Sequence, residues 1–168
     1  MVEIVYPDID EIENLHKVEK DCWEDLAASL EEMRKRYELH PEGYVAIRKE
    51  GEIAAFTFGI RYNYNEVDPD TWYEATDLEL HSPDERDMYI VSVTVAPSFQ
   101  GQGIGRRLMD ATNSRAEEQG VDRVVLGSRD TTVGFFKKCG FDPVERKEEW
   151  WPEDEESEGY GVVMEYRL

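Results

Sequence analysis

The pattern of apolar and polar positions divides the chain into short strands and amphipathic helices. Near the middle, Val91, Val93 and Val95 alternate with Ser92 and Thr94, a period typical of a β-strand. Alternating or continuous apolar runs predict seven strands, at residues 2–6, 43–47, 53–62, 89–95, 123–128, 141–150 and 161–168. Apolar residues three and four positions apart predict four helices, at residues 8–22, 26–37, 104–119 and 131–139.

The predicted elements follow the order strand, two helices, three strands, helix, strand, helix and two strands. Strands and helices mixed in this way indicate an α/β (α+β) protein. A length of 168 residues suits one compact domain, so we expect residues 1–168 to form a single domain. Residues 49–52 connect the second and third strands, and Gly51 is suited to the positive φ of such a turn.

A glycine-rich turn follows the strand at residues 89–95. Pro97 ends the strand, and Gly101, Gly103 and Gly105 lead into a helix. The first turn of a helix carries unpaired N–H groups and the positive end of the helix dipole, which together can hold a phosphate. A tight turn without any ligand explains the glycines equally well. Neither G-x-G-x-x-G nor G-x-x-x-x-G-K-[ST] occurs in the chain.

A longer signature separates these two interpretations. The string Gln100-x-x-Gly103-x-Gly105 resembles the acyl-CoA signature of the GNAT superfamily, the GCN5-related N-acetyltransferases. Residues 135–141, Phe-Phe-Lys-Lys-Cys-Gly-Phe, are similar to the second signature of that family. The resemblance covers residues 89–141. It implies a central mixed, mostly antiparallel sheet of about seven strands with helices on both faces.

The resemblance further implies transfer of an acetyl group from acetyl-CoA to an amine. The backbone of the cofactor strand would bind the pantetheine amides, and the glycine-rich turn would hold the pyrophosphate. Phe136 would lie beside the sulfur end of the cofactor. The cofactor-binding residues expected from the family are Val93, Thr94, Val95, Gln100, Gly101, Gln102, Gly103, Ile104, Gly105, Arg106 and Phe136.

Side chains for acid–base catalysis are harder to assign. Many GNAT members use the tyrosine of the second signature to protonate the leaving thiolate, and here that position is Phe136. Tyr89 is a candidate base, or a packing aromatic. His81 is a candidate base, or a surface histidine. Ser128 could orient a water molecule. Cys139 could take part in a covalent route, although a small buried core residue is the simpler interpretation.

The charge is strongly and unevenly negative. Thirty-nine acidic residues against 19 basic ones give a net charge of −20, yet residues 98–140 carry a net charge of +2. The signature segment therefore suits an anionic ligand such as CoA. The dispersed acids elsewhere favour adaptation to a high-salt (halophilic) cytoplasm over attraction of a cationic substrate. No basic stripe predicts nucleic-acid binding, no apolar run predicts a membrane span, and no metal-ligand spacing occurs.

Residues 63–87 form an unusually long connection for this family. The aromatic residues Trp72 and Tyr73 in it could cover the acceptor site, or a short helix at residues 70–78 could dock Trp72 into the core.

The sequence as a whole predicts a cytoplasmic acetyl-CoA-dependent N-acetyltransferase acting on a small-molecule or protein amine. The alternative is an acyl-CoA-binding sensor of the same fold with little turnover. Assembly as a homodimer stays open.

Overall fold

The protein is described from a computed structural model, which describes residues 1–65, 78–148, 150 and 159–168. The strands are β1 (Val2–Val5), β2 (Tyr44–Lys49), β3 (Glu52–Arg61), β4 (Asp87–Val95), β5 (Arg123–Arg129), β6 (Asp142–Lys147) and β7 (Gly161–Arg167). The helices are α1 (Ile12–Trp23), α2 (Leu30–Leu39), α3 (Ile104–Glu118) and α4 (Val133–Lys138). The residues predicted to form a helix at 70–78 lie mostly outside the described part of the chain, as do Trp72 and Tyr73.

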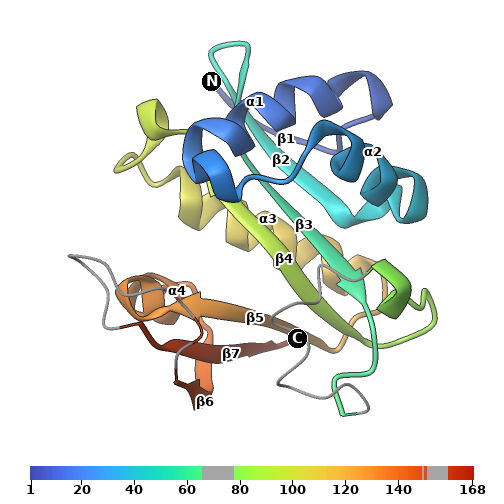
Figure 1. The fold of residues 1–168 in the computed structure, drawn as a ribbon, viewed down its shortest axis with the longest axis vertical. Coiled ribbons are helices and arrows are strands. Elements are labelled where there is room, and N and C mark those ends of the chain that lie inside the picture. Colours follow the sequence, from blue (N-terminus) through green and yellow to red (C-terminus); the bar gives the residue numbers. More distant parts are fainter. Residues whose placement is uncertain (66–77, 149, 151–158) are drawn as a thin grey trace. The chain divides into compact units, whose positions relative to one another are not determined.

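The structure confirms the predicted order of strands and helices (Figure 1). The strands form one seven-stranded mixed sheet in the order β1-β2-β3-β4-β5-β7-β6, which confirms the predicted fold class. Strands β4 and β5 pair in parallel, through Asp87–Ile90 and Arg123–Leu126. A parallel pair needs a crossover connection, and α3 supplies it here.

Three predicted helix starts were wrong. The first helix begins at Ile12 rather than at residue 8, after a 3-10 turn at Ile9–Glu11. The second helix begins at Leu30 rather than at residue 26, because Ser29 caps it by accepting a hydrogen bond from the Glu32 N–H (3.1 Å). Helix α4 begins at Val133, after a 3-10 turn at Asp130–Thr132 whose helical φ and ψ precede the first α-helical turn. The spacing of apolar residues reveals neither a capping side chain nor a 3-10 turn, so it could not predict these starts.

Contacts divide the chain into two compact units. Unit 1 comprises residues 1–60 and 91–115, and unit 2 comprises residues 61–90 and 116–168. Strand β4 contributes to both, since its first four residues belong to unit 2 and its last five to unit 1. The expectation of a single domain stays a prediction.

Unit 1 contains the first hairpin and residues 104–115 of the long helix α3. Strands β2 and β3 are joined by Glu50 and Gly51, both at positive φ (55° and 83°), so the prediction for Gly51 is confirmed. Tyr44 of β2 packs its ring 4.5 Å from that of Phe58 and donates its hydroxyl to the Met33 carbonyl of α2 (3.1 Å). On β3, the Thr57 hydroxyl contacts the Thr112 hydroxyl of α3 at 2.8 Å.

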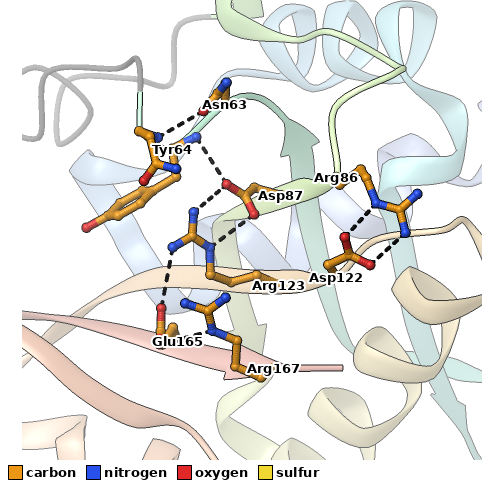
Figure 2. A network of polar contacts seen from close by, with 9 residues as sticks. Asn63, Tyr64, Arg86, Asp87, Asp122, Arg123, Glu165 and Arg167 are labelled. Carbon is orange, nitrogen blue, oxygen red and sulfur yellow. Dashed lines mark hydrogen bonds and ion pairs between the residues drawn. The ribbon is translucent and has the colours of Figure 1, made fainter.

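Unit 2 is organised around an ion pair at the start of β4 and β5 (Figure 2). The Arg123 Nε donates to Asp87 Oδ1 at 3.0 Å, and its Nη2 donates to Asp87 Oδ2. The guanidinium also lies 3.6 Å from Glu165 of β7 and 4.7 Å from the centre of the Tyr64 ring. Both Asp87 and Arg123 are largely buried, and their hydrogen bonds raise the pKa of Arg123, which therefore stays charged.

A backbone hydrogen bond links the β3 and β4 segments within each unit. In unit 1 the Ala96 N–H donates to the Ala54 carbonyl (2.8 Å), and in unit 2 the Tyr62 N–H donates to the Asp87 carbonyl (3.2 Å).

Candidate functional site

The glycine-rich turn after β4 is exposed and adopts a conformation that requires glycine. Gly101 and Gly103 have φ of +73° and +78°, which other residues rarely adopt. A Cβ atom built at either position would meet nothing within 4 Å, so packing does not explain these glycines. The open space over both leaves room for a ligand to approach the backbone.

The turn and the start of α3 present a run of backbone donors. The first α-helical hydrogen bond at this end runs from the Arg107 N–H to the Gly103 carbonyl (3.2 Å). Among the described residues, no acceptor is found for the N–H groups from Gly101 to Arg106. The side chain of Ile104 is buried, which anchors the helix start, whereas Arg106 and Arg107 are exposed. Six free N–H groups beside two exposed guanidinium groups suit an anionic ligand.

Side chains hold this turn in place. The Gln100 Nε2 donates to the Val95 carbonyl (3.0 Å), and the Gln102 Nε2 donates to the Ser98 carbonyl (3.1 Å). The Lys49 ammonium, at the end of β2, donates to Gln102 Oε1 at 2.5 Å and lies 5.9 Å from the centre of the Phe99 ring. Lys49 therefore adds a cation beside the turn, a residue that the sequence analysis did not single out.

The end of β4 lies against the C-terminal end of α1. The Cys22 thiol donates to the Val95 carbonyl (2.9 Å), so this carbonyl accepts from both Cys22 and Gln100. The Trp23 Nε1 donates to the Thr94 hydroxyl (3.1 Å). Because Ala96 bonds to β3, strand alternation turns the backbone of Val95 away from β3.

A buried glutamate on α1 joins this group. Glu19 is 4% exposed, and its carboxylate accepts from the Ser92 hydroxyl (3.2 Å), the Thr94 hydroxyl (3.1 Å) and the Ala28 N–H (3.3 Å). The sequence analysis missed it, although a signal was present. Glu19 lies four residues after Leu15 and seven after Ile12, which places it on the buried side of the helix.

His81 has a local structural partner, and its role as a base stays a prediction. Its Nδ1 accepts a hydrogen bond from the Arg61 N–H (3.1 Å), so the neutral ring carries its proton on Nε2 and has no free lone pair. Burial, followed by the charge of Arg61, lowers the pKa of His81. The lowered pKa keeps the ring neutral near pH 7.

Tyr89 and Ser128 both have local structural partners. The Tyr89 ring contacts Tyr62 edge-on at 5.8 Å and packs against the cluster of Val125, Trp150 and Val163. This environment favours the packing interpretation of Tyr89. The Ser128 hydroxyl donates to the Arg129 carbonyl (2.8 Å) at the end of β5. Its catalytic role stays a prediction, as does that of Tyr89.

Phe136 and Cys139 belong to unit 2. Phe136 is 7% exposed and contacts the rings of Phe135 and Phe141 at 5.0 and 6.0 Å. Cys139 follows α4, is buried and forms no disulfide. Each residue therefore fits the core of unit 2, and the placement of Phe136 beside a cofactor stays a prediction.

The described residues contain neither a metal-binding cluster nor a membrane-spanning helix. No group of three or more His, Cys, Asp or Glu residues could hold a metal ion in that part of the chain. None of the helices described is both long and apolar enough to cross a membrane.

Comparison with known proteins identifies the class. The model of the acetyltransferase (GNAT) family matches residues 9–141, and the chain belongs to that family. The uncharacterized N-acetyltransferase YkwB of Bacillus subtilis (strain 168) is 24% identical over 192 aligned residues, which cover 94% of this chain and 84% of YkwB.

Solved structures share the fold across the whole chain. The loading GNATL domain of CurA from Lyngbya majuscula has a TM-score of 0.83 at 21% identity, covering 99% of this chain and 98% of that domain. The GNAT-like decarboxylase GphF, in complex with isobutyryl-CoA, has a TM-score of 0.79 at 20% identity, with coverages of 99% and 98%. At these identities the likeness is one of fold.

Proposed function

We propose that this GNAT-family protein is an N-acetyltransferase that transfers the acetyl group of acetyl-CoA to an amine. The observation that carries the proposal is the run of free N–H groups from Gly101 to Arg106, with exposed Arg106 and Arg107 beside it. A chain with a net charge of −20 repels anions at long range. A dense local group of hydrogen-bond donors in such a chain supports the binding of an anionic ligand at this place.

We propose a separate task for each part of the site. The turn at Gly101–Gly103 and the start of α3 bind the pyrophosphate of CoA, and Lys49 adds a positive charge at the edge. Val93 offers its backbone to the pantetheine amides. The carbonyl of Val95 is already held by Cys22 and Gln100, so at this residue the free group for the cofactor is the N–H.

A second candidate function follows from Phe136. At this position a tyrosine could protonate the leaving thiolate, but the phenylalanine ring, packed between Phe135 and Phe141, has no proton to give. This observation favours an acyl-CoA-binding sensor with little turnover. The nature of the acyl group is open as well, since GphF is in complex with isobutyryl-CoA.

One experiment separates these functions. Acetyl-CoA, isobutyryl-CoA and CoA are titrated calorimetrically into the protein in molar KCl, and release of CoA is then followed with spermidine, kanamycin and a peptide with a free N-terminus. Micromolar binding and steady CoA release establish the transferase. Binding without release establishes the sensor. A folded protein that binds none of the three ligands overturns both.

A further inference from the structure

Three oxygen atoms of unit 1 form a buried triangle. The Glu19 Oε2 lies 3.2 Å from the Ser92 hydroxyl and 3.1 Å from the Thr94 hydroxyl, and these two hydroxyls lie 3.1 Å apart. The three residues are 4%, 8% and 1% exposed. Ser92 and Thr94 belong to β4, the strand proposed to bind the cofactor.

The triangle has fewer protons than contacts. Each hydroxyl carries one proton, so the two hydroxyls can satisfy only two of the three oxygen–oxygen contacts. The Trp23 Nε1–H cannot fill the third, because it points at the Thr94 hydroxyl from outside the triangle. With Glu19 ionised, one edge lacks a proton, and a proton on Glu19 completes all three edges.

The residues around Glu19 donate hydrogen bonds to its carboxylate but provide no positive charge. Among the described residues no basic side chain pairs with its carboxylate, whose third partner is the Ala28 N–H. A buried carboxylate without a cation is costly to keep, so the position calls for a functional reason.

The titratable groups that face Glu19 stay neutral near pH 7. Burial, followed by the charges of Glu19 and Asp21, raises the pKa of Cys22 to about 11. Burial also raises the pKa of Tyr44 on β2 well above its usual range, and Arg36 and Glu32 of α2 act on Tyr44 in turn. A neutral thiol and a neutral phenol cannot take up a further proton, so of these three groups the carboxylate of Glu19 is the one that can accept it.

We propose that the Glu19–Ser92–Thr94 triangle is the proton acceptor of the acetyl transfer, an inference that rests on the proposed function. The ammonium form of the acceptor gives one proton to the Ser92 oxygen, directly or through one water, while the Ser92 proton passes to Glu19. The free amine then forms the N–C bond as the C–S bond breaks. The second proton lost from nitrogen goes to the thiolate, and the proton on Glu19 leaves to solvent. Glu19 acts through Ser92 and is therefore a positioning residue.

The test compares Glu19→Gln and Ser92→Ala with the parent protein. The amide is isosteric and can satisfy both hydroxyls, but it cannot take up a proton. We expect kcat for a reacting amine to fall at least about 10-fold in either variant, within the usual range for lost acid–base catalysis. Acetyl-CoA affinity should stay within about twofold. The pH dependence of kcat should be weaker in Glu19→Gln, because this variant has no carboxylate in the triangle.

Thr57→Val is the matched control, because it removes a buried hydroxyl contact of the same unit with no carboxylate involved. It should lower stability without changing kcat or its pH dependence. Unchanged kcat and pH profile in Glu19→Gln, or an equal loss in Thr57→Val, would overturn the proposal.

A second measurement needs no acceptor. Difference infrared spectra between the parent and Glu19→Gln should show a buried carboxylic acid band that appears on acidification while the protein stays folded, and Ser92→Ala should shift it. A carboxylate that never protonates in the folded protein contradicts the proposal. If the carboxylic acid band appears but the protein acetylates no amine, Glu19 is a site of proton uptake and the proposed transferase function is wrong.

Discussion

Two poorly exposed carboxylates adjoin β4, and they have opposite kinds of partner. Asp87, in unit 2, accepts two hydrogen bonds from the guanidinium of Arg123. Among the described residues, Glu19, in unit 1, accepts from two hydroxyls and one backbone N–H. The first arrangement raises the pKa of Arg123 through its hydrogen bonds to Asp87, so the guanidinium stays charged. The second leaves a proton position open.

The difference teaches how one strand can serve two purposes. Near its start, β4 is held by a charge-assisted pair whose loss would leave buried charges uncompensated. Near its end, β4 carries neutral hydroxyls and leads into the free N–H groups of the glycine-rich turn. Loss of the Asp87–Arg123 pair should therefore change stability, and changes at the glycine-rich turn or at the hydroxyls beside Glu19 should change binding and chemistry.

The largest expected effect is on stability. Arg123→Met leaves Asp87 and Glu165 without their shared cation, and we expect the free energy of unfolding to fall by about 3 kcal/mol. Urea denaturation in molar KCl measures it. Arg86→Met is the matched control, because its pair with Asp122 is exposed and should change stability far less. If both variants lose the same free energy of unfolding, burial does not make the Asp87–Arg123 pair more important for stability than the exposed pair.

The next effect concerns the glycine-rich turn. Gly103→Glu places a side chain and a negative charge where the pyrophosphate is proposed to bind, so acetyl-CoA affinity should fall at least about 100-fold, or ~2.7 kcal/mol. Gly120→Glu is the control. Gly120 also has φ of +78° and no neighbour within 4 Å, but it follows α3. Calorimetry that shows undiminished binding in Gly103→Glu would place the cofactor elsewhere.

A smaller effect is expected at the missing acid. Phe136→Tyr restores a phenol at the position of the family's tyrosine, and kcat should rise several-fold if thiolate protonation limits the reaction. Steady-state rates with saturating acetyl-CoA measure the change. No gain would show that protonation of the thiolate does not limit the reaction.

The smallest expected effect is a pH dependence of the protein's stability that arises from the Cys22 thiol, which lies near Glu19. Burial raises the pKa of Cys22 from 9.0 to about 11, so the thiol is protonated in both folded and unfolded states below pH 9. Between pH 9 and 11 only the unfolded thiol ionises, and stability should fall. Cys22→Ala should make this decline shallower in urea titrations. Glu19→Gln should lower the pKa of Cys22, since the charge of Glu19 is its second cause; an unchanged pKa would show that this charge does not act on the thiol.

Local patterns predicted much of the fold. The strand, turn and helix from residue 89 onward lie consecutively in the chain, and their conformations follow from β-branched residues, a proline and glycines. The backbone has positive φ at residues 51 and 101, and both residues are glycine because a side chain is disfavoured in that conformation. The start of α4 was misplaced because a 3-10 turn and an α-helix share apolar spacing over so few residues.

The sequence by itself therefore determined the order of elements, the fold family and the glycine-rich turn, all of which depend on neighbouring residues. Only the tertiary structure decided which distant side chains meet. Glu19 reaches Ser92 across 73 residues, and Lys49 reaches Gln102 across 53. A glutamate on the apolar side of a helix does not reveal its partner. Partners such as hydroxyls or a guanidinium are chosen by packing, and packing brings residues together without regard to their separation in the chain.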